Sequence, residues 1–341
     1  MTRKQLQNLK PLYKMFSDKK HNYETLEEGK LFLASPKLFN DVFDGCIYFD
    51  YLEFEKKYLL KKYIHNNEYC EVIKKSKEYD SALENLVRYI GFRKENLYAI
   101  LDSINLGTEE EYISPIDKSL LEKEIKNKYK AYLKEINKIR NSYYVACFTE
   151  AKPENNVSMW YFYAKNYNGF CCEFALDKNR HNLNSSEFTK DDYELNIWKR
   201  LHKVNYNAPI PRINVDYLLT LKMKDVYHDK IINKIVEKSF TYKNRSWKNE
   251  NEWRLIIKRE DDFLEKCDRE DVLGGIKINY PFLTKLYIVR KRENKEKVEK
   301  IKGIIKAQGV PVEMYDIGKG HCSFLEFKND INIDLMLNNI F

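Results

Sequence analysis

The stretch from Cys147 to Phe174, CFTEAKPENNVSMWYFYAKNYNGFCCEF, constrains the fold of this chain most tightly. Its first residues predict a strand that ends around Thr149, and a polar loop and a short aromatic helix through Trp160 follow. A turn at Gly169 then precedes the apolar run up to Phe174, which predicts a second strand. Two strands that flank an aromatic helix bring strand ends, rings and acids close together, so a site can form there.

Apolar segments elsewhere predict the remaining strands of a central sheet. Residues 11–16 and 31–33 predict two early strands, with a helix around 23–28 between them that Gly29 ends. Later strands are predicted at 201–206, 252–258, 285–290 and 310–315. The last two of these strands join through a helix predicted at 293–308, which gives a βαβ-like unit.

Residues 51–141 differ from the rest, because apolar side chains recur there at spacings of three and four in segments rich in Lys and Glu. That spacing predicts several amphipathic helices, and a further helix is predicted from Val215 to Ser239. The predicted fold class is therefore α+β, a central mixed or split β-sheet with flanking helices. Residues 1–341 are predicted to form a single domain with a helical insertion at about 51–141.

The charge of the chain is spread rather than concentrated. The net charge of +8 comes from 60 basic and 52 acidic residues, and runs such as Lys291 to Lys302 alternate in sign at helical spacing. This alternation is typical of a solvated helix face, whereas a nucleic-acid footprint should be clustered. A nucleic-acid or protein partner stays open on this evidence. Aromatic residues make up 14% of the chain and Gly and Pro are few, so the composition indicates a folded protein.

Standard chemical motifs are scarce in this sequence. The seven cysteines show no CxxC spacing and the six histidines form no HExxH or HxH pair, so neither a metal nor a disulfide is expected. The sequence contains no phosphate loop, no GxGxxG and no GxSxG. It also has no signal sequence and no apolar run near twenty residues, so we expect a cytoplasmic protein without a membrane partner.

Two groups of polar residues stand out beside apolar anchors. Asn40, Asp41 and Asp44 lie among phenylalanines, where they either cap a helix and tie down a turn or face a cleft. Glu252 and Arg254 fall two residues apart on one face of a strand whose other face is buried, so that this face is predicted to be the more polar one. They either form an ordinary ion pair or orient a bound ligand.

Five motifs, taken in order, resemble a known family. The motifs are LYKMF (12–16), LFLASPKLFNDVFD (31–44), CFTE (147–150), MWYFYAKNYNGFCCEF (159–174) and NEWRLI (251–256). Together they resemble a widespread prokaryotic family known as domain of unknown function 2971. The resemblance spans most of the chain except the helical insertion, and by itself it implies no activity.

The order of parts is also similar to that of an ADP-ribosyltransferase, in which a split sheet binds NAD. This similarity implies an enzyme that uses NAD as its substrate, either a transferase or a glycohydrolase. Such chemistry needs an aromatic ring that stacks on nicotinamide and a carboxylate that holds the ribose hydroxyl and stabilises an oxocarbenium-like transition state. Glu252 is the predicted catalytic carboxylate. The predicted substrate contacts are Tyr13, Lys14, Ser35, Asn40, Asp41, Trp160, Tyr163, Glu173 and Arg254, with Glu173 as the second choice of carboxylate.

Two further interpretations stay open. The first is a non-catalytic module that binds a small nucleotide ligand, a peptide or nucleic acid in an aromatic cleft, as an accessory of a bacterial anti-phage or stress system. An NAD-consuming enzyme would instead fit a defence or toxin effector. The second is a nuclease in which Asp41, Asp44 and Glu252 hold Mg²⁺.

Overall fold

The structure is a computed structural model. It describes residues 9–39, 41, 43–60, 118–175, 193–220, 226–289, 299–301, 303–304 and 313–316. The predicted contact Asn40, most of the predicted insertion, the polar loop after Phe174 and most of the helix predicted at 293–308 lie outside these residues. The chain divides into two compact units, one of residues 1–45, 141–209 and 240–341 and the other of residues 46–140 and 210–239.

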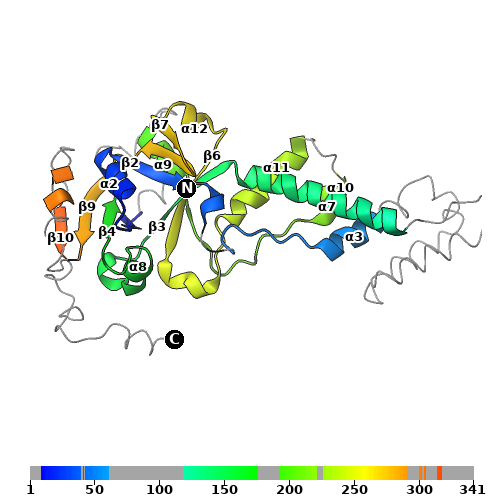
Figure 1. Cartoon of the computed structure of the whole chain (residues 1–341), viewed down its shortest axis with the longest axis horizontal. Coiled ribbons are helices and arrows are strands. Elements are labelled where there is room, and N and C mark those ends of the chain that lie inside the picture. The colour runs from blue at the N-terminus through cyan, green and yellow to red at the C-terminus, as the bar shows by residue number, and fades with distance from the viewer. Residues whose placement is uncertain are drawn as a thin grey trace, which may run out of the picture. The chain divides into compact units, whose positions relative to one another are not determined.

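The first unit contains a mixed sheet, which confirms the α+β fold class (Figure 1). Its described strands are β1 (Leu12–Phe16), β2 (Lys30–Ala34), β3 (Tyr143–Thr149), β4 (Phe170–Phe174), β5 (Leu201–Lys203), β6 (Glu252–Lys258), β7 (Arg269–Val272), β8 (Gly275–Asn279), β9 (Leu283–Ile288) and β10 (Glu313–Asp316). They run in the order β10-β9-β4-β1-β3-β2-β8-β7, and β6 joins β5 to β3. β9 and β10 pair in parallel, as the βαβ-like unit predicts, and the other described pairs are antiparallel.

The sheet splits along one edge of β3. On its other edge, β3 pairs with β6 over its whole length. On the split edge, β1 meets β3 where Tyr13 lies opposite Thr149, and β2 meets it where Ala34 lies opposite Val145. β1 continues the sheet through β4 and β2 continues it through β8, so the two strands diverge between these contacts. We call the space between β1 and β2 along β3 the fork.

Short helices connect these strands. They are α2 (Lys20–Glu27), α8 (Val157–Phe162), α9 (Tyr193–Lys199) and α12 (Asp262–Glu265), with short 3₁₀ segments at Pro36–Leu38, Pro153–Asn155 and Arg245–Glu250. Gly29 follows α2 with φ of 64°, in the left-handed region that glycine adopts without strain. After α8, three consecutive residues take left-handed conformations, and this turn leads the chain directly into β4.

Gly169 at the end of that turn has no room for a side chain. A Cβ atom placed there would lie 1.9 Å from the Phe16 carbonyl oxygen. The close approach fixes the turn against β1, and β4 then spans Phe170 to Phe174 as predicted. Buried residues of the strands and helices form one large core cluster, which includes Leu12, Phe148 and Leu255.

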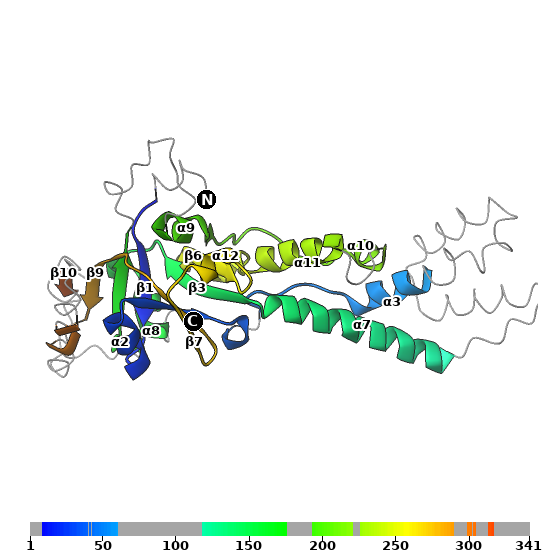
Figure 2. The ribbon, with the colours of Figure 1, turned by 90° about the horizontal axis from the view of Figure 1, so that it is seen from above.

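The second unit is helical where it is described. It contains α3 (Tyr51–Leu60), α7 (Lys118–Arg140), α10 (Val215–Thr220) and α11 (Val226–Ser239), and α7 lies alongside α11 (Figure 2). Phe54 is fully buried among the rings of Tyr58, Tyr129 and Tyr132. The single helix predicted from Val215 to Ser239 is described as α10 and α11, and the residues between them are not described. In the described part of both units, no helix has the length and apolar character needed to cross a lipid bilayer.

Candidate functional site in the fork of the sheet

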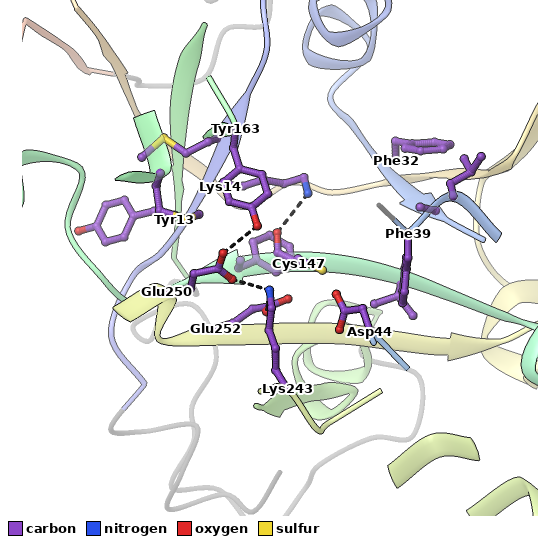
Figure 3. Close-up of a pocket in the computed structure, with 16 residues that line it drawn as sticks. Tyr13, Lys14, Phe32, Phe39, Asp44, Cys147, Tyr163, Lys243, Glu250 and Glu252 are labelled. Carbon is purple, nitrogen blue, oxygen red and sulfur yellow. Dashed lines mark hydrogen bonds and ion pairs between the residues drawn. The ribbon is translucent and has the colours of Figure 1, made fainter. Parts of the chain in front are cut away.

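A cavity of about 200 Å³ lies in the fork (Figure 3). Its walls come from β1, β2, β3, β6, α8 and the loops after β2 and before β6. They are formed by Tyr13, Lys14, Met15, Phe32, Ala34, Leu38, Phe39, Asp44, Val145, Cys147, Phe148, Met159, Tyr163, Lys243, Glu250 and Glu252. The divergence of β1 from β2 therefore places parts of all five family-like motifs around one space.

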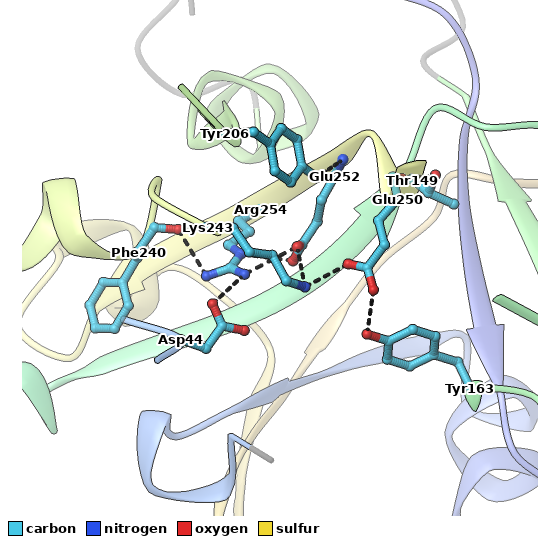
Figure 4. A network of polar contacts seen from close by, with 9 residues as sticks. All are labelled: Asp44, Thr149, Tyr163, Tyr206, Phe240, Lys243, Glu250, Glu252 and Arg254. Atoms are coloured by element: carbon cyan, nitrogen blue, oxygen red, sulfur yellow. Dashed lines mark hydrogen bonds and ion pairs between the residues drawn. The ribbon is translucent and has the colours of Figure 1, made fainter. Parts of the chain in front are cut away.

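Glu252 and Arg254 form a bidentate ion pair on β6. Arg254 Nε lies 2.7 Å from Glu252 Oε1, and Arg254 Nη2 lies 3.1 Å from Glu252 Oε2. The same guanidinium donates to Asp44 Oδ1 at 2.7 Å and to the Phe240 carbonyl at 3.1 Å (Figure 4). Two planar partners matched in this way fix each other's orientation. Arg254 thus ties the start of β6 to the loop that carries Asp44.

The more polar face predicted for β6 is buried at the start of the strand. Glu252 is 4% exposed and Arg254 is 0% exposed, whereas Trp253 on the other face is only partly buried. The alternation of the strand is correct, but the polar face packs against other charged groups instead of water. Sequence periodicity shows which residues share a face, and it does not show what covers that face.

Lys243 and Glu250 extend the ion pair into a larger cluster. Lys243 Nζ lies 2.5 Å from Glu250 Oε2 and 3.0 Å from Glu252 Oε2. Tyr163 Oη donates to Glu250 Oε1 at 2.7 Å. We call the buried set Asp44, Lys243, Glu250, Glu252 and Arg254 the polar network. It holds three carboxylates and two cations, and four of its members line the cavity.

The network separates the pKa values of its carboxyls. Burial alone would raise the pKa of Glu252, but the adjacent Arg254 and Lys243 outweigh burial and lower this pKa to about 2. Burial raises the pKa of Glu250 and of Asp44, and the neighbouring cations offset this only in part. Glu252 is therefore the strongly acidic member at neutral pH, and its neighbours hold protons more readily than ordinary carboxyls do.

Lys14 enters the same cavity from β1. Its Nζ donates to the Cys147 carbonyl oxygen at 3.1 Å and lies 5.6 Å and 5.7 Å from the ring centroids of Phe16 and Phe148. The Cys147 carbonyl belongs to the stretch of β3 between its contacts with β1 and β2. The lysine therefore supplies a hydrogen bond where a neighbouring strand would otherwise pair. Burial lowers the pKa of this amine.

Trp160, predicted to contact the substrate, lies away from the cavity walls. It is 2% exposed, its ring stacks on that of Tyr167, and its Nε1 donates to the Pro153 carbonyl at 2.9 Å. With Tyr13, Met15, Ala164, Tyr167, Cys171, Tyr287 and Val289 it forms a separate buried group, which we call the aromatic cluster. Tyr13 borders the cavity, but its ring meets that of Tyr287 edge-on and points away from Lys14 (Figure 3).

Glu173, Ser35 and Asp41 also lie outside the cavity walls. Glu173 accepts hydrogen bonds from Tyr287 Oη at 2.7 Å and from Thr284 Oγ1 at 3.0 Å. The Ser35 amide donates to the Gly274 carbonyl, and Asp41 Oδ1 accepts from the Phe43 amide at 2.9 Å. The contact of Asp41 matches the turn-forming alternative that its sequence context left open. The structure thus brings Lys14, Tyr163, Glu252 and, behind them, Arg254 together.

Sequence reasoning missed Lys243 and Glu250. Glu250 stands two residues before Glu252, so a search for paired acids in the segment NENEW would have found it. Lys243 precedes a 3₁₀ segment whose length and direction are set by the fold, and no sequence signal marks it. In the part of the chain that the structure describes, no group of three His, Cys, Asp or Glu side chains could hold a metal ion. Asp44 and Glu252 both contact Arg254 instead.

One comparison with known proteins finds a family model that matches part of the chain. Residues 159–255 match the family model described as Protein of unknown function (DUF2971). The match confirms the resemblance to this family over that stretch. It begins in α8 and ends in β6, so it contains Tyr163, Lys243, Glu250, Glu252 and Arg254. No curated protein and no solved structure matches the chain.

Proposed function

We propose that this chain is an ADP-ribosyltransferase-like enzyme that cleaves the bond between nicotinamide and ribose in NAD, with Glu252 as its catalytic carboxylate. The observation that carries the proposal is the position of Glu252, which lines a cavity in the fork of a split sheet. Cavities bordered by a few convergent polar groups and perturbed carboxyls are the usual places for catalysis. A defence or toxin effector in the cytoplasm is the setting that fits such an activity.

The ionisation of Glu252 suits this chemistry. Departure of nicotinamide leaves positive charge on the ribose carbon and ring oxygen, and a fixed anion nearby stabilises that transition state. Because the pKa of Glu252 is lowered to about 2, its carboxylate is charged at neutral pH. Arg254 and Lys243 hold both of its oxygens in place, so little reorganisation is needed during the reaction.

Glu250 supplies the complementary property. A water or hydroxyl that attacks the ribose carbon must lose a proton as the new bond forms, and a carboxylate with a raised pKa accepts a proton more readily than Glu252 does. Tyr163 and Lys243 each donate to Glu250, so its position is fixed relative to Glu252. In this proposal Glu252 stabilises charge and Glu250 receives the proton of the nucleophile.

Aromatic surface for the nicotinamide ring comes from residues other than Trp160. Tyr163, Phe32 and Phe39 line the cavity, and the Arg254 guanidinium lies 5.9 Å from the Phe39 ring centroid. An aromatic amide buries its faces favourably against such rings. We therefore assign stacking on the nicotinamide to these residues and give Trp160 a packing role.

A non-catalytic nucleotide-binding module is the second candidate. It is favoured by the engagement of Glu252, because both carboxylate oxygens already accept hydrogen bonds from Arg254 and one also contacts Lys243. In this reading the polar network shapes the cavity and orients a ligand without taking part in a reaction. A protein or nucleic-acid partner would then bind the ligand-bound form of the protein.

Nicotinamide release separates the two candidates. Purified full chain is incubated with NAD, with and without cell extract as a source of acceptors, and compared with Glu252→Gln and with the control Glu270→Gln on β7. We expect release by the wild type and by the control, and a loss of at least about 100-fold in Glu252→Gln. Circular dichroism checks that each variant folds. Absence of release from the folded wild type in both conditions contradicts the enzyme and leaves the binding module.

A further inference from the structure

Two lysines line the fork cavity, and they have opposite surroundings. Lys243 Nζ lies between the carboxylates of Glu250 and Glu252, at 2.5 Å and 3.0 Å. Lys14 Nζ lies 5.6 Å and 5.7 Å from the centroids of two phenyl rings and donates to one backbone carbonyl. Among the described residues, no carboxylate oxygen comes within 4.0 Å of Lys14. Lys243 is therefore held as a cation by two carboxylates, whereas the half-buried Lys14 contacts a backbone carbonyl and two ring faces and forms no ion pair with any described residue.

We propose that Lys14 is a reactive amine, which forms a reversible imine with a small aldehyde or ketone bound in the fork cavity. The proposal concerns the same cavity as the NAD chemistry but does not depend on it, because the amide of NAD does not condense with an amine. A lysine desolvated in an apolar pocket is the usual form of an imine-forming residue.

The surroundings of Lys14 favour its neutral form. The rings of Phe16 and Phe148 shield the amine from water, although their faces also attract an ammonium group, and the Cys147 carbonyl accepts a hydrogen bond from either the neutral or the charged form. Burial lowers the pKa of Lys14, while Cys147, Glu252 and Cys172 counteract burial only in part. Each unit by which the pKa of a lysine falls raises its neutral fraction at neutral pH about tenfold.

The reaction balances with groups that line the cavity. The Lys14 nitrogen attacks the carbonyl carbon and gives a carbinolamine, and the nitrogen then loses its protons as the hydroxyl leaves. One water is released and a carbon–nitrogen double bond forms. The departing hydroxyl requires a proton, and Glu250 has a raised pKa and a hydrogen bond from Tyr163 in the same cavity. These two residues are placed to shuttle it.

The size and walls of the cavity limit the ligand. A volume of about 200 Å³ admits a small molecule, and Phe32, Phe39 and Val145 provide apolar surface beside the amine. A short aldehyde or ketone with an apolar substituent matches these walls. The charged groups on the other side of the cavity form ion pairs with one another, so they do not require a charged ligand.

Reductive trapping tests the proposal on the full wild-type chain. The protein is incubated near pH 7 with acetaldehyde and sodium cyanoborohydride, which reduces an imine to a stable amine, and modified lysines are located by mass spectrometry. Lys20 on α2, whose side chain is 87% exposed, is the reference, and Lys243 is the buried control. We expect modification of Lys14 at least about tenfold faster than that of Lys20, with Lys243 unmodified.

Equal or slower modification of Lys14 than of Lys20 overturns the proposal. The variant Lys14→Arg keeps the positive charge and a donor for the Cys147 carbonyl, but it has no primary amine. We expect it to fold and to lose the adduct on the β1 peptide, which confirms the assignment of the modified site. Nicotinamide release by the wild type is measured in parallel, so that failure of imine trapping and failure of the NAD chemistry are distinguished.

Discussion

The polar network and the aromatic cluster both border the candidate site, but they use their residues in opposite ways. Both contain residues that the sequence marks as ligand contacts, Glu252 and Arg254 in the first and Trp160 in the second. The polar network lines the cavity, and the aromatic cluster packs against β1, β4 and β9. A large ring in a site-like motif therefore belongs to the core here, while the buried charges border the cavity.

The difference has an energetic basis. Burial of an aromatic side chain is favourable in itself, so the position of Trp160 needs no ligand to explain it. Burial of Glu252 and Arg254 is costly, because each charge loses its hydration, and only its interaction with the partner charge compensates this loss. Stability alone does not explain an ion pair buried beside a cavity, and we attribute its presence to binding of the proposed ligand.

Removal of Arg254 from the polar network is expected to cause the largest loss in the free energy of unfolding. Arg254→Met leaves the carboxylates of Glu252 and Asp44 buried without their guanidinium, and we expect a loss of about 5 kcal/mol in the free energy of unfolding. Urea denaturation measures this loss, with the exposed Arg245→Ala as control. A loss below about 1 kcal/mol would show that the network does not hold the start of β6 in place.

The aromatic cluster is tested by Trp160→Ala, with an expected loss of about 4 kcal/mol from the cavity that it leaves. Phe162, which is 55% exposed on the same helix, is the control, and its replacement by Ala should change the free energy of unfolding by less than about 0.5 kcal/mol. We expect the KM for NAD to stay unchanged in folded Trp160→Ala. A large rise in KM with little loss of stability would move Trp160 from the core to the site.

Removal of one hydroxyl gives a smaller effect. Tyr163→Phe deletes the hydrogen bond to Glu250 and should cost about 1.5 kcal/mol in the free energy of unfolding. Tyr161→Phe, two residues earlier in α8, is the matched control and should change little. Because Glu250 would lose a donor that stabilises its charged form, its pKa should rise, and the acidic limb of the rate profile should move to higher pH. An unchanged profile would separate Glu250 from the reaction.

The pH dependence of stability tests how much the ionised Glu252 of the polar network contributes to the fold. The folded-state pKa of this carboxyl lies near 2, below its ordinary value of 4.5, so its ionisation stabilises the fold above pH 4.5. This contribution should be lost as pH falls from 4.5 toward 2. Glu252→Gln should flatten that part of the curve relative to the wild type. Glu250 and Asp44 have raised pKa values and act in the opposite direction, so the difference between the two curves is the quantity to compare.

Local patterns in the sequence predicted much of the sheet. The limits of β4 follow from the apolar run between Gly169 and Ala175, and β1 and β2 follow from short apolar segments bounded by polar residues. The split of the sheet was also expected, although only the pairing of Tyr13 and Ala34 with β3 shows where it occurs. Periodicity within a strand is a local property, which is why these strands could be predicted from the sequence.

Which residues form the site depends on contacts between distant parts of the chain, and such contacts leave no local pattern in the sequence. Asp44 and Arg254 are 210 residues apart in the chain, and Lys14 and Cys147 are 133 apart. Lys243 joins the network because a 3₁₀ segment returns it to the start of β6. The single-domain organisation and the helical insertion stay predictions, as do the roles assigned to the site residues.

Steric closure of the fork is the most direct test of the proposal that the fork is the site of NAD cleavage, because it leaves every charge in place. Ala34 lines the cavity on β2, and Ala34→Phe should fill part of it at a cost of about 1–3 kcal/mol in stability. Ala151→Phe, outside the cavity walls, is the matched control. We predict that folded Ala34→Phe loses nicotinamide release while Ala151→Phe keeps it. Release from Ala34→Phe at the wild-type rate would contradict the assignment of the fork as the site.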